Sequence, residues 1–262
     1  MYSRAVVRTK DDAKKFIGAG AVISLYKPKV QNYQWSSSRI KLLNGADSIE
    51  AGWMVNPEVF KDNEAHFYAK FSTGGRECIN QLCPGFVEVN NHSYLGSIPM
   101  RYTQIGVNYW NWNYWNWNVT IDKQQDDGHW WLSLTDENNR IIRIGYWPKS
   151  LFSSSLAAVS TQVEWGGEIN NPGPSASQPE MGSGYKSANI LAAIFSQIRT
   201  VNEGSQKIQP NDLEVTRKKK KKNDFEEFED CSSFYTVKDY GYRNDYWGRL
   251  IYYGGTHRWI KF

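Results

Sequence analysis

The sequence lacks the motifs of several common classes of enzyme and binding protein. No stretch approaches the ~20 consecutive apolar residues of a membrane-spanning helix, so we expect no membrane partner. Neither a phosphate-binding Gly-Lys-Ser/Thr loop nor a Gly-x-Ser-x-Gly nucleophile elbow occurs, which counts against nucleotide hydrolases and serine hydrolases. The His residues are scattered, and no second pair of Cys or His lies at zinc-ligand spacing. We therefore predict neither a metal ion nor a cofactor.

Residues 1–10 also lack the apolar core of a secretory signal peptide. Two N-glycosylation sequons are nevertheless present, Asn91-His92-Ser93 and Asn118-Val119-Thr120. Because so short a motif arises by chance, the two sequons support a secreted protein only weakly.

Cysteine is scarce, with three residues in the chain. Cys78 and Cys83 are spaced so that a disulfide can close a tight loop between them. The alternative is a pair of buried thiols, and the spacing does not distinguish the two. Cys231 has no evident partner, which in a secreted protein indicates a free thiol or a missing mate.

The chain also lacks a strong charge of either sign outside one segment. The formal net charge is +4, but residues 217–222 are all basic and are followed at once by an acidic cluster within residues 224–230. Such blocks are usually solvated, and no base-stacking or groove-reading module supports a nucleic-acid interpretation of the basic run. We predict a flexible charged insertion over residues 203–230 and no nucleic-acid partner.

What the sequence does contain is aromatic residues and short apolar runs. Aromatics make up 15% of the chain, with 12 Trp and 16 Tyr, and they suit pleated, half-buried surfaces. The expected strands are Ala21–Leu25, Ile40–Leu43, Ser48–Val55, His66–Phe71, Gly85–Val89, Gln104–Tyr109, Trp117–Ile121, His129–Leu134, Arg140–Trp147, Gln162–Glu168, Phe234–Val237 and Arg249–Tyr253. Many short strands without a βαβ rhythm predict an all-β sandwich or barrel, here as one domain over residues 1–262.

Two segments depart from this strand pattern. In Ser187–Val201 the apolar residues return at helical spacing, which predicts one amphipathic helix packed on the sheet, or alternatively a binding helix. Asn108–Asn118 alternates Asn with aromatic residues. We interpret it as an expanded strand connection, with an aromatic recognition loop as the alternative.

Several motifs in order resemble the neprosin family of plant peptidases. They are GAGA at residues 18–21 with Pro28, SIEAGWMVNP at 48–57, CINQLCPGFV at 78–87, WWL at 130–132, GYWPKSLF at 145–152, WGGE at 165–168, MGSG at 181–184 and YYGG at 252–255. The resemblance implies an antiparallel β-sandwich with one short helix and long loops. It also implies a peptidase that cleaves a peptide or protein substrate after proline, in an acidic extracellular or vacuolar setting, and we expect a monomer.

The resemblance assigns catalysis to Glu50 and Glu168. Each lies beside glycine or apolar residues and near a Trp, where an ordinary surface glutamate is not expected. Two carboxylates held close share one proton, so we expect one pKa to rise. One glutamate then acts as general base on water while its protonated partner polarises the scissile carbonyl. Trp53 and Trp165 flank the pair, either to stack on a substrate proline or to pack in the core.

The sequence also departs from the family pattern. The signal peptide and the inhibitory pro-segment of the family are not in it, and after Gly255 it lacks the terminal Cys that the resemblance pairs with Cys231. An inactive truncated copy therefore remains an alternative, as does a non-catalytic carbohydrate- or cell-wall-binding sandwich. A glycoside hydrolase, which also uses two carboxylates, is a third class.

Overall fold

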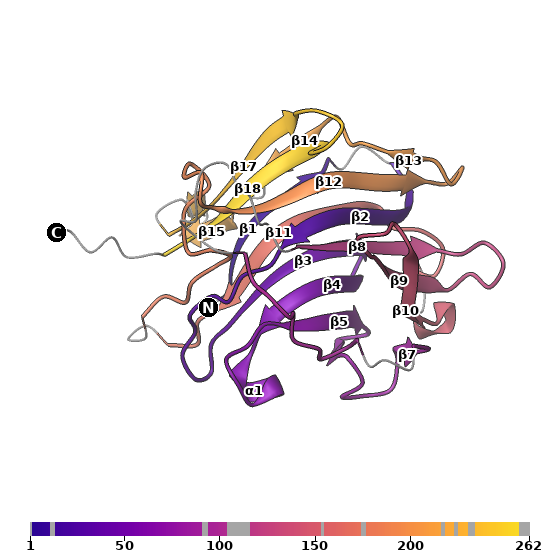
Figure 1. Ribbon diagram of the computed structural model, residues 1–262, viewed down its shortest axis with the longest axis horizontal. Coiled ribbons are helices and arrows are strands. Elements are labelled where there is room, and N and C mark those ends of the chain that lie inside the picture. Colours follow the sequence, from indigo (N-terminus) through magenta and orange to yellow (C-terminus); the bar gives the residue numbers. More distant parts are fainter. Residues whose placement is uncertain are drawn as a thin grey trace.

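A computed structural model of the protein describes residues 2–10, 14–90, 94–103, 116–152, 155–173, 177–215, 218–222, 225–229 and 234–256. Within these residues the chain forms two antiparallel sheets packed face to face, as the resemblance implies (Figure 1). In spatial order, the seven-stranded sheet contains β14 (Leu213–Val215), β1 (Tyr2–Thr9), β11 (Gln162–Asn170), β3 (Trp35–Asn44), β4 (Asp47–Val55), β5 (His66–Thr73) and β6 (Arg76–Ile79).

The nine-stranded sheet forms the other layer. Its order is β17 (Tyr235–Tyr242), β18 (Arg249–Gly255), β12 (Ala193–Asn202), β2 (Phe16–Ser24), β8 (Asn116–Lys123), β9 (Trp130–Thr135), β10 (Ile141–Trp147) and β7 (Val87–Glu88), with β13 (Lys207–Ile208) on β12. All pairings within both sheets are antiparallel.

The core lies between the sheets and follows the two-residue alternation of the strands. In β4, Ile49, Ala51, Trp53 and Val55 point inward and are fully buried. The residues between them, including Glu50, must then point to the outer face of the seven-stranded sheet. Alternation within β4 therefore separates the candidate catalytic carboxylate from the hydrophobic core.

Among the described residues there is one short α-helix, α1 (Pro57–Phe60), which follows β4 after Asn56. Asn56 caps its first turn by accepting hydrogen bonds from the backbone N–H groups of Glu58 and Val59. A 3-10 turn, η1 (Lys149–Leu151), follows β10. No helix among the described residues is long and apolar enough to cross a membrane.

The helix predicted over Ser187–Val201 is wrong, because most of this segment is strand β12, paired with β2 and β18. The error comes from a bulge between Ser196 and Arg199, where Gln197 has a φ of 52°. The extra residue places Phe195 and Ile198 on the same inward face three residues apart. This spacing is the one expected of a helix, so the apolar pattern alone was misleading.

The segment at 203–230, predicted as a flexible insertion, contains four short strands. β14 forms an edge of the seven-stranded sheet beside β1, and β13 pairs with the end of β12 in the nine-stranded sheet. β15 (Lys218–Lys222) pairs with β16 (Phe225–Glu229) as a separate ribbon. The strand predicted at Gln104–Tyr109 and most of the Asn/aromatic tract lie outside the described residues. Every other predicted strand overlaps an observed one.

Candidate active site

Strand register brings Glu50 and Glu168 to the same outer face of the seven-stranded sheet. β3 lies between β4 and β11, so two strands that are distant in sequence flank one central strand. Glu50 on β4 lies opposite Lys41 of β3, and Glu168 on β11 lies opposite Ser37. Residues opposite each other in a sheet share a face. Both glutamates therefore face outward, one on each side of β3.

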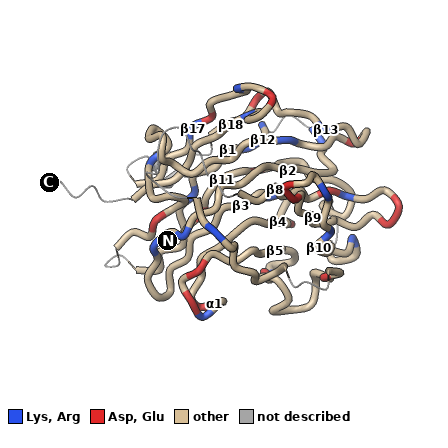
Figure 2. Tube along the Cα trace, in the orientation of Figure 1, with Lys and Arg blue, Asp and Glu red and all other residues tan. Residues whose placement is uncertain are grey.

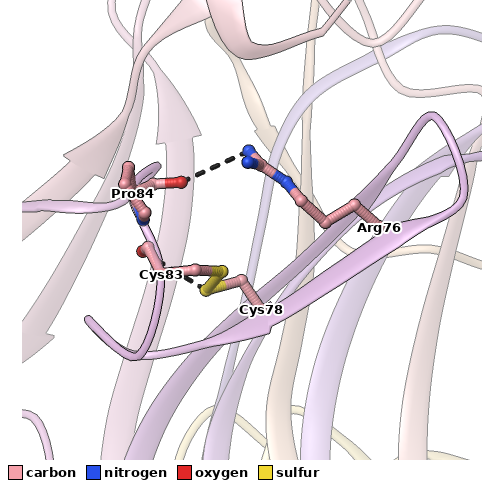
Figure 3. Close-up of a disulfide and its surroundings, with 4 residues drawn as sticks. All are labelled: Arg76, Cys78, Cys83 and Pro84. Atoms are coloured by element: carbon pink, nitrogen blue, oxygen red, sulfur yellow. Dashed lines mark hydrogen bonds between the residues drawn. A yellow bond between two sulfur atoms is a disulfide. The ribbon is translucent and has the colours of Figure 1, made fainter.

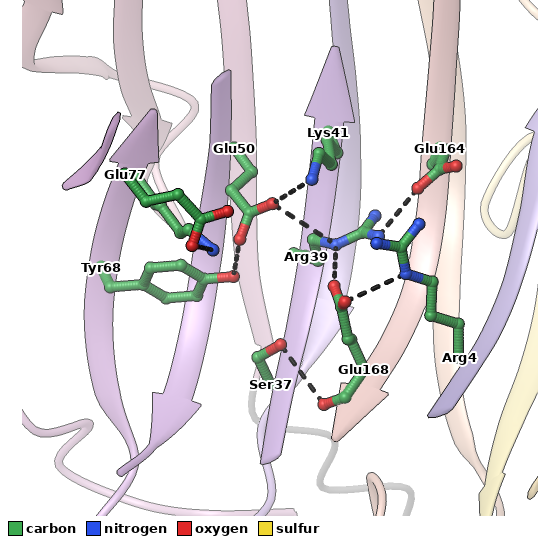
Figure 4. Close-up of polar contacts among 10 residues, drawn as sticks. Arg4, Ser37, Arg39, Lys41, Glu50, Tyr68, Glu77, Glu164 and Glu168 are labelled. Carbon is green, nitrogen blue, oxygen red and sulfur yellow. Dashed lines mark hydrogen bonds and ion pairs between the residues drawn. The ribbon is translucent and has the colours of Figure 1, made fainter. Parts of the chain in front are cut away.

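Arg39, midway between Ser37 and Lys41, occupies the space between the two glutamates (Figure 4). Its neighbours across the sheet are Gly52 on β4 and Gly166 on β11. A Cβ at Gly52 would lie 1.9 Å from Ser38 O, and one at Gly166 would lie 2.2 Å from Ala5 O. Neither position accommodates a side chain, so Arg39 alone fills the centre of this face.

The guanidinium of Arg39 contacts three carboxylates. Its Nε lies 3.6 Å from Glu50 Oε2 and 3.2 Å from Glu168 Oε2, and its Nη2 donates to Glu164 Oε2 at 2.7 Å. The distance between the two glutamate oxygens cannot exceed the sum of their distances to Nε. The structure therefore brings the two predicted catalytic residues together, around a cation that motif comparison did not single out.

Glu50 has further partners on its other side. Tyr68 donates its hydroxyl to Glu50 Oε1 at 3.0 Å, and Lys41 Nζ lies 3.2 Å from Glu50 Oε2. Burial raises the pKa of Glu50, but the positive charges of Lys41, Lys70 and Arg39 outweigh burial and lower that pKa to about 2. Glu50 is therefore held as a carboxylate.

Glu168 is less enclosed. Arg4 Nε on the neighbouring strand β1 donates to Glu168 Oε1 at 3.0 Å, and the Arg4 side chain is 43% exposed. Burial and the charge of Glu50 raise the pKa of Glu168, whereas Arg39 and Arg4 lower it, and the net direction is downward. The pKa of Arg39 is raised by its three carboxylate partners despite full burial.

These directions differ from the expectation of a shared proton with one raised pKa. Two close carboxylates raise a pKa when nothing compensates their charges. Here Arg39 lies between them, so both pKa values are lowered. The prediction considered the two glutamates alone. The place of Arg39 between them depends on the register of β3 with β4 and β11, which the sequence does not give.

Trp53 and Trp165 do not line this site. Both point inward from their strands and have no exposed surface, and Trp53 Nε1 donates to Ser24 O at 2.9 Å across the core. Neither ring is therefore accessible from the outer face that carries the two glutamates. Of the two interpretations offered by the sequence, the structure supports core packing.

The remaining predicted sites lie away from the glutamates. Cys78 on β6 forms a disulfide with Cys83, which resolves the alternative of two buried thiols (Figure 3). Asn118 lies in β8, and its side-chain oxygen accepts a hydrogen bond from Arg199. Asn91 and Cys231 fall outside the described residues. No group of three or more His, Cys, Asp or Glu among the described residues is arranged to hold a metal ion.

A cavity of about 730 Å³ lies on the opposite side of the molecule, and the sequence did not indicate it. It is lined by Ala188, Ile190, Ile194, Tyr240, Arg243, Tyr246, Trp247, Leu250 and Tyr252. On β18, Tyr252 alternates with the inward residues Ile251 and Tyr253. The cavity therefore opens on the outer face of the nine-stranded sheet and does not include the glutamates.

Comparison with known proteins gives both a family and remote structural similarities. Two similar solved structures are of scytalido-glutamic peptidase, with a peptide-based transition-state analogue (8% identity, 97% of both chains, TM-score 0.44) and with a transition-state analogue inhibitor (8%, 97% of both, 0.45). A third is SCP-B, a member of the Eqolisin family of peptidases, with the tripeptide Ala-Ile-His (7%, 97% of this chain and 96% of that one, 0.43). The neprosin family model matches residues 32–256. The chain thus belongs to the neprosin family and is a glutamic-type peptidase.

Proposed function

We propose that the chain hydrolyses peptide bonds after proline at acidic pH, with Glu50 and Glu168 as its catalytic carboxylates. The observation that supports this most strongly is the convergence of the two glutamates. They come from strands far apart in sequence, lie on one outer face, and both approach Arg39 Nε within 3.6 Å. Each is almost fully buried, which is unusual for a glutamate without a function.

The two glutamates differ in surroundings, and this difference supports a proposal for their roles. Glu50 has more fixed partners, Tyr68 and Lys41 among them, and stays ionised. Glu168 is the more exposed of the two, and the charge of Glu50 favours a proton on it. Glu50 is thus the general base and Glu168 is the acid.

In the proposed reaction, Glu50 takes a proton from water while the water oxygen bonds to the scissile carbonyl carbon. Protonated Glu168 donates a hydrogen bond to the carbonyl oxygen and stabilises the negative charge that develops there. The carbon–nitrogen bond then breaks, and the leaving amine takes the proton held by Glu50. The second hydrogen of the water remains on the new carboxyl group, so both glutamates return to their starting states.

The preference for proline and the acidic setting rest on the family resemblance. We extend it to a secreted or vacuolar location, a single-domain monomer, and a peptide or protein as substrate. The family gives the peptide substrate, whereas the other properties are proposals. Peptide cleavage against pH addresses the acidic optimum, and a sizing experiment addresses the monomer.

The test is cleavage of a proline-containing reporter peptide between pH ~2 and 7, a range that extends below the usual one for such a pair because both glutamate pKa values are lowered. Glu168→Gln should lower kcat/KM by at least ~100-fold, the usual contribution of general acid–base catalysis. Glu214→Gln is the matched control, because Glu214 lies in the same sheet but pairs with Arg8 near the edge. A folded wild type without cleavage anywhere in this range, or equal losses in both variants, would contradict the proposal.

A carbohydrate-binding function is favoured by one observation, the aromatic cavity on the opposite face. The ring centres of Tyr240 and Tyr252 are 4.8 Å apart in this cavity, and the Tyr246 side chain is largely exposed. Retention on cell-wall polysaccharide should then survive Glu50→Gln and disappear in Tyr246→Ala. Wild-type protein that is not retained would exclude this second function.

A further inference from the structure

In the proposed reaction the general base binds the attacking water and the acid binds the carbonyl oxygen. Both must therefore lie close to the space between the two carboxylates. A water that serves both must lie within hydrogen-bonding distance of each, about 2.7–3.2 Å. In this chain the Nε of Arg39 already lies 3.6 Å from one carboxylate oxygen and 3.2 Å from the other. The guanidinium thus lies between the two carboxylates, with its Nε facing one oxygen of each.

The sheet gives no other residue this position. Gly52 and Gly166 lie opposite Arg39 on the two neighbouring strands, and neither tolerates a Cβ. The identity of residue 39 therefore decides what separates Glu50 from Glu168. Arg39 is also held firmly, because it is fully buried and its Nη2 donates to Glu164.

We propose that Arg39 is a positioning residue that separates the two catalytic glutamates, keeps both of them charged, and thereby confines peptide hydrolysis to strongly acidic pH. This inference rests on the proposed function, because it concerns the protonated glutamate that the proposed reaction needs. Its consequence is a gain of function. A neutral side chain at position 39 should extend activity toward neutral pH.

The charges around the pair explain why. The cations that face it are Arg39 and Lys41 on β3, Arg4 on β1 and Lys70 on β5, and the anions are Glu50 on β4, Glu164 and Glu168 on β11, and Glu77 on β6. Tyr68 on β5 contributes a neutral hydroxyl, and Arg8 on β1 pairs separately with Glu214 on β14. Each nearby carboxylate thus has a compensating cation.

Removal of Arg39 leaves one carboxylate without a compensating charge. A buried carboxylate in that state takes up a proton instead of remaining charged. Glu164 loses the cation that it pairs with, and Glu168 loses the charge that most lowers its pKa and keeps only the partly exposed Arg4. Glu50 keeps Lys41 and Tyr68, so within the catalytic pair Glu168 is the expected site of a proton. A protonated Glu168 beside an ionised Glu50 is the state from which the proposed reaction starts.

The experiment measures kcat/KM on the reporter peptide against pH for the wild type, Arg39→Gln and Arg39→Lys. Wild type and Arg39→Lys should lose activity over the same strongly acidic range. In Arg39→Gln the midpoint of that loss should move up by at least about one pH unit, which corresponds to roughly tenfold more activity at a fixed pH above the wild-type midpoint. An unchanged profile in folded Arg39→Gln overturns the proposal, as does loss of its activity at every pH, which would make Arg39 essential.

Arg39→Gln leaves the buried Glu164 without its partner, which destabilises the fold. The double variant Arg39→Gln/Glu164→Gln removes one charge of each sign and avoids that. It removes the same positive charge from between the two glutamates, so it should still cleave above the wild-type range, with a smaller shift than Arg39→Gln. A folded double variant with the wild-type profile overturns the proposal.

A titration that does not depend on activity separates this inference from the proposed function. Carbon NMR of the glutamate carboxyl groups reports their protonation directly. In the wild type, Glu50 and Glu168 should both titrate below the ordinary glutamate pKa, and in Arg39→Gln one of them should titrate above it. If the wild type already shows a raised glutamate pKa, the inference fails even when the peptide is cleaved. If neither the wild type nor any Arg39 variant cleaves the reporter peptide but the titrations shift as expected, only the proposed function fails.

Discussion

On the outer face of the seven-stranded sheet, charged side chains are buried against one another. The outer face of the nine-stranded sheet, near β12, β17 and β18, instead presents aromatic rings around a cavity. Arg39 has no exposed surface on the first face, whereas Tyr246 is 76% exposed on the second. Charges of both signs also lie in turns, as beside α1 (Figure 2).

The difference lies in how strongly the residues of each face depend on one another. A buried charge is tolerated only while its partners compensate it, so one substitution beside Arg39 alters every member of the cluster. Exposed rings carry no such penalty, and each contributes nearly independently. Substitutions on the two faces should therefore have very different consequences for the same chemical change.

The largest effect on stability is expected at Glu164, whose carboxylate binds Arg39 Nη2 at 2.7 Å. Glu164→Gln removes that charge and leaves a buried guanidinium short of a partner, which should lower the free energy of unfolding by about 3–5 kcal/mol. Glu214→Gln, at a partly exposed pair with Arg8, should cost less than about 1 kcal/mol. Urea denaturation of both variants checks this, and equal losses would erase the distinction between buried and surface pairs.

A smaller effect is expected from pH. The pKa of Glu50 lies at about 2 in the folded chain, below its ordinary value of 4.5. Ionised Glu50 therefore stabilises the fold fully above pH ~4.5, and this stabilisation, on the order of 3 kcal/mol, is lost as the pH falls toward 2. Thermal melts from pH 6 to 2.5 should show a falling Tm, with a shallower fall in Glu50→Gln. Identical slopes in the two proteins would argue against a lowered Glu50 pKa.

The smallest effect is expected on the aromatic face. Tyr246 projects into solvent and contacts chiefly the ring of Trp247, with 5.0 Å between ring centres. Tyr246→Ala should change the free energy of unfolding by less than about 0.5 kcal/mol and leave peptide hydrolysis within about twofold of the wild type. A tenfold loss of kcat/KM would instead show that the cavity contributes to hydrolysis and would contradict the functional separation of the two faces.

The sequence predicted well those features that depend on local patterns. Alternation around Glu50 and the motifs on both sides indicated strands, and the resemblance indicated which two glutamates to examine. Arg39 was missed because its role depends on the register of β3 with β4 and β11, which are long-range pairings. β12 was missed because its bulge imitates helical spacing. Lys41 alternates with Arg39 on the same strand, and this pattern of charges in an otherwise apolar run was the available signal.

The central claim is that Glu50 and Glu168 work as one catalytic unit, and the most direct test is kcat/KM of Glu50→Gln, Glu168→Gln and the double variant at the acidic optimum. Residues that act as a unit are strongly non-additive. Each single variant should lose at least ~100-fold, and the double variant should lose little more than the worse single one. A folded single variant with near wild-type activity would contradict the assignment, and fully additive losses would show that the two carboxylates act separately.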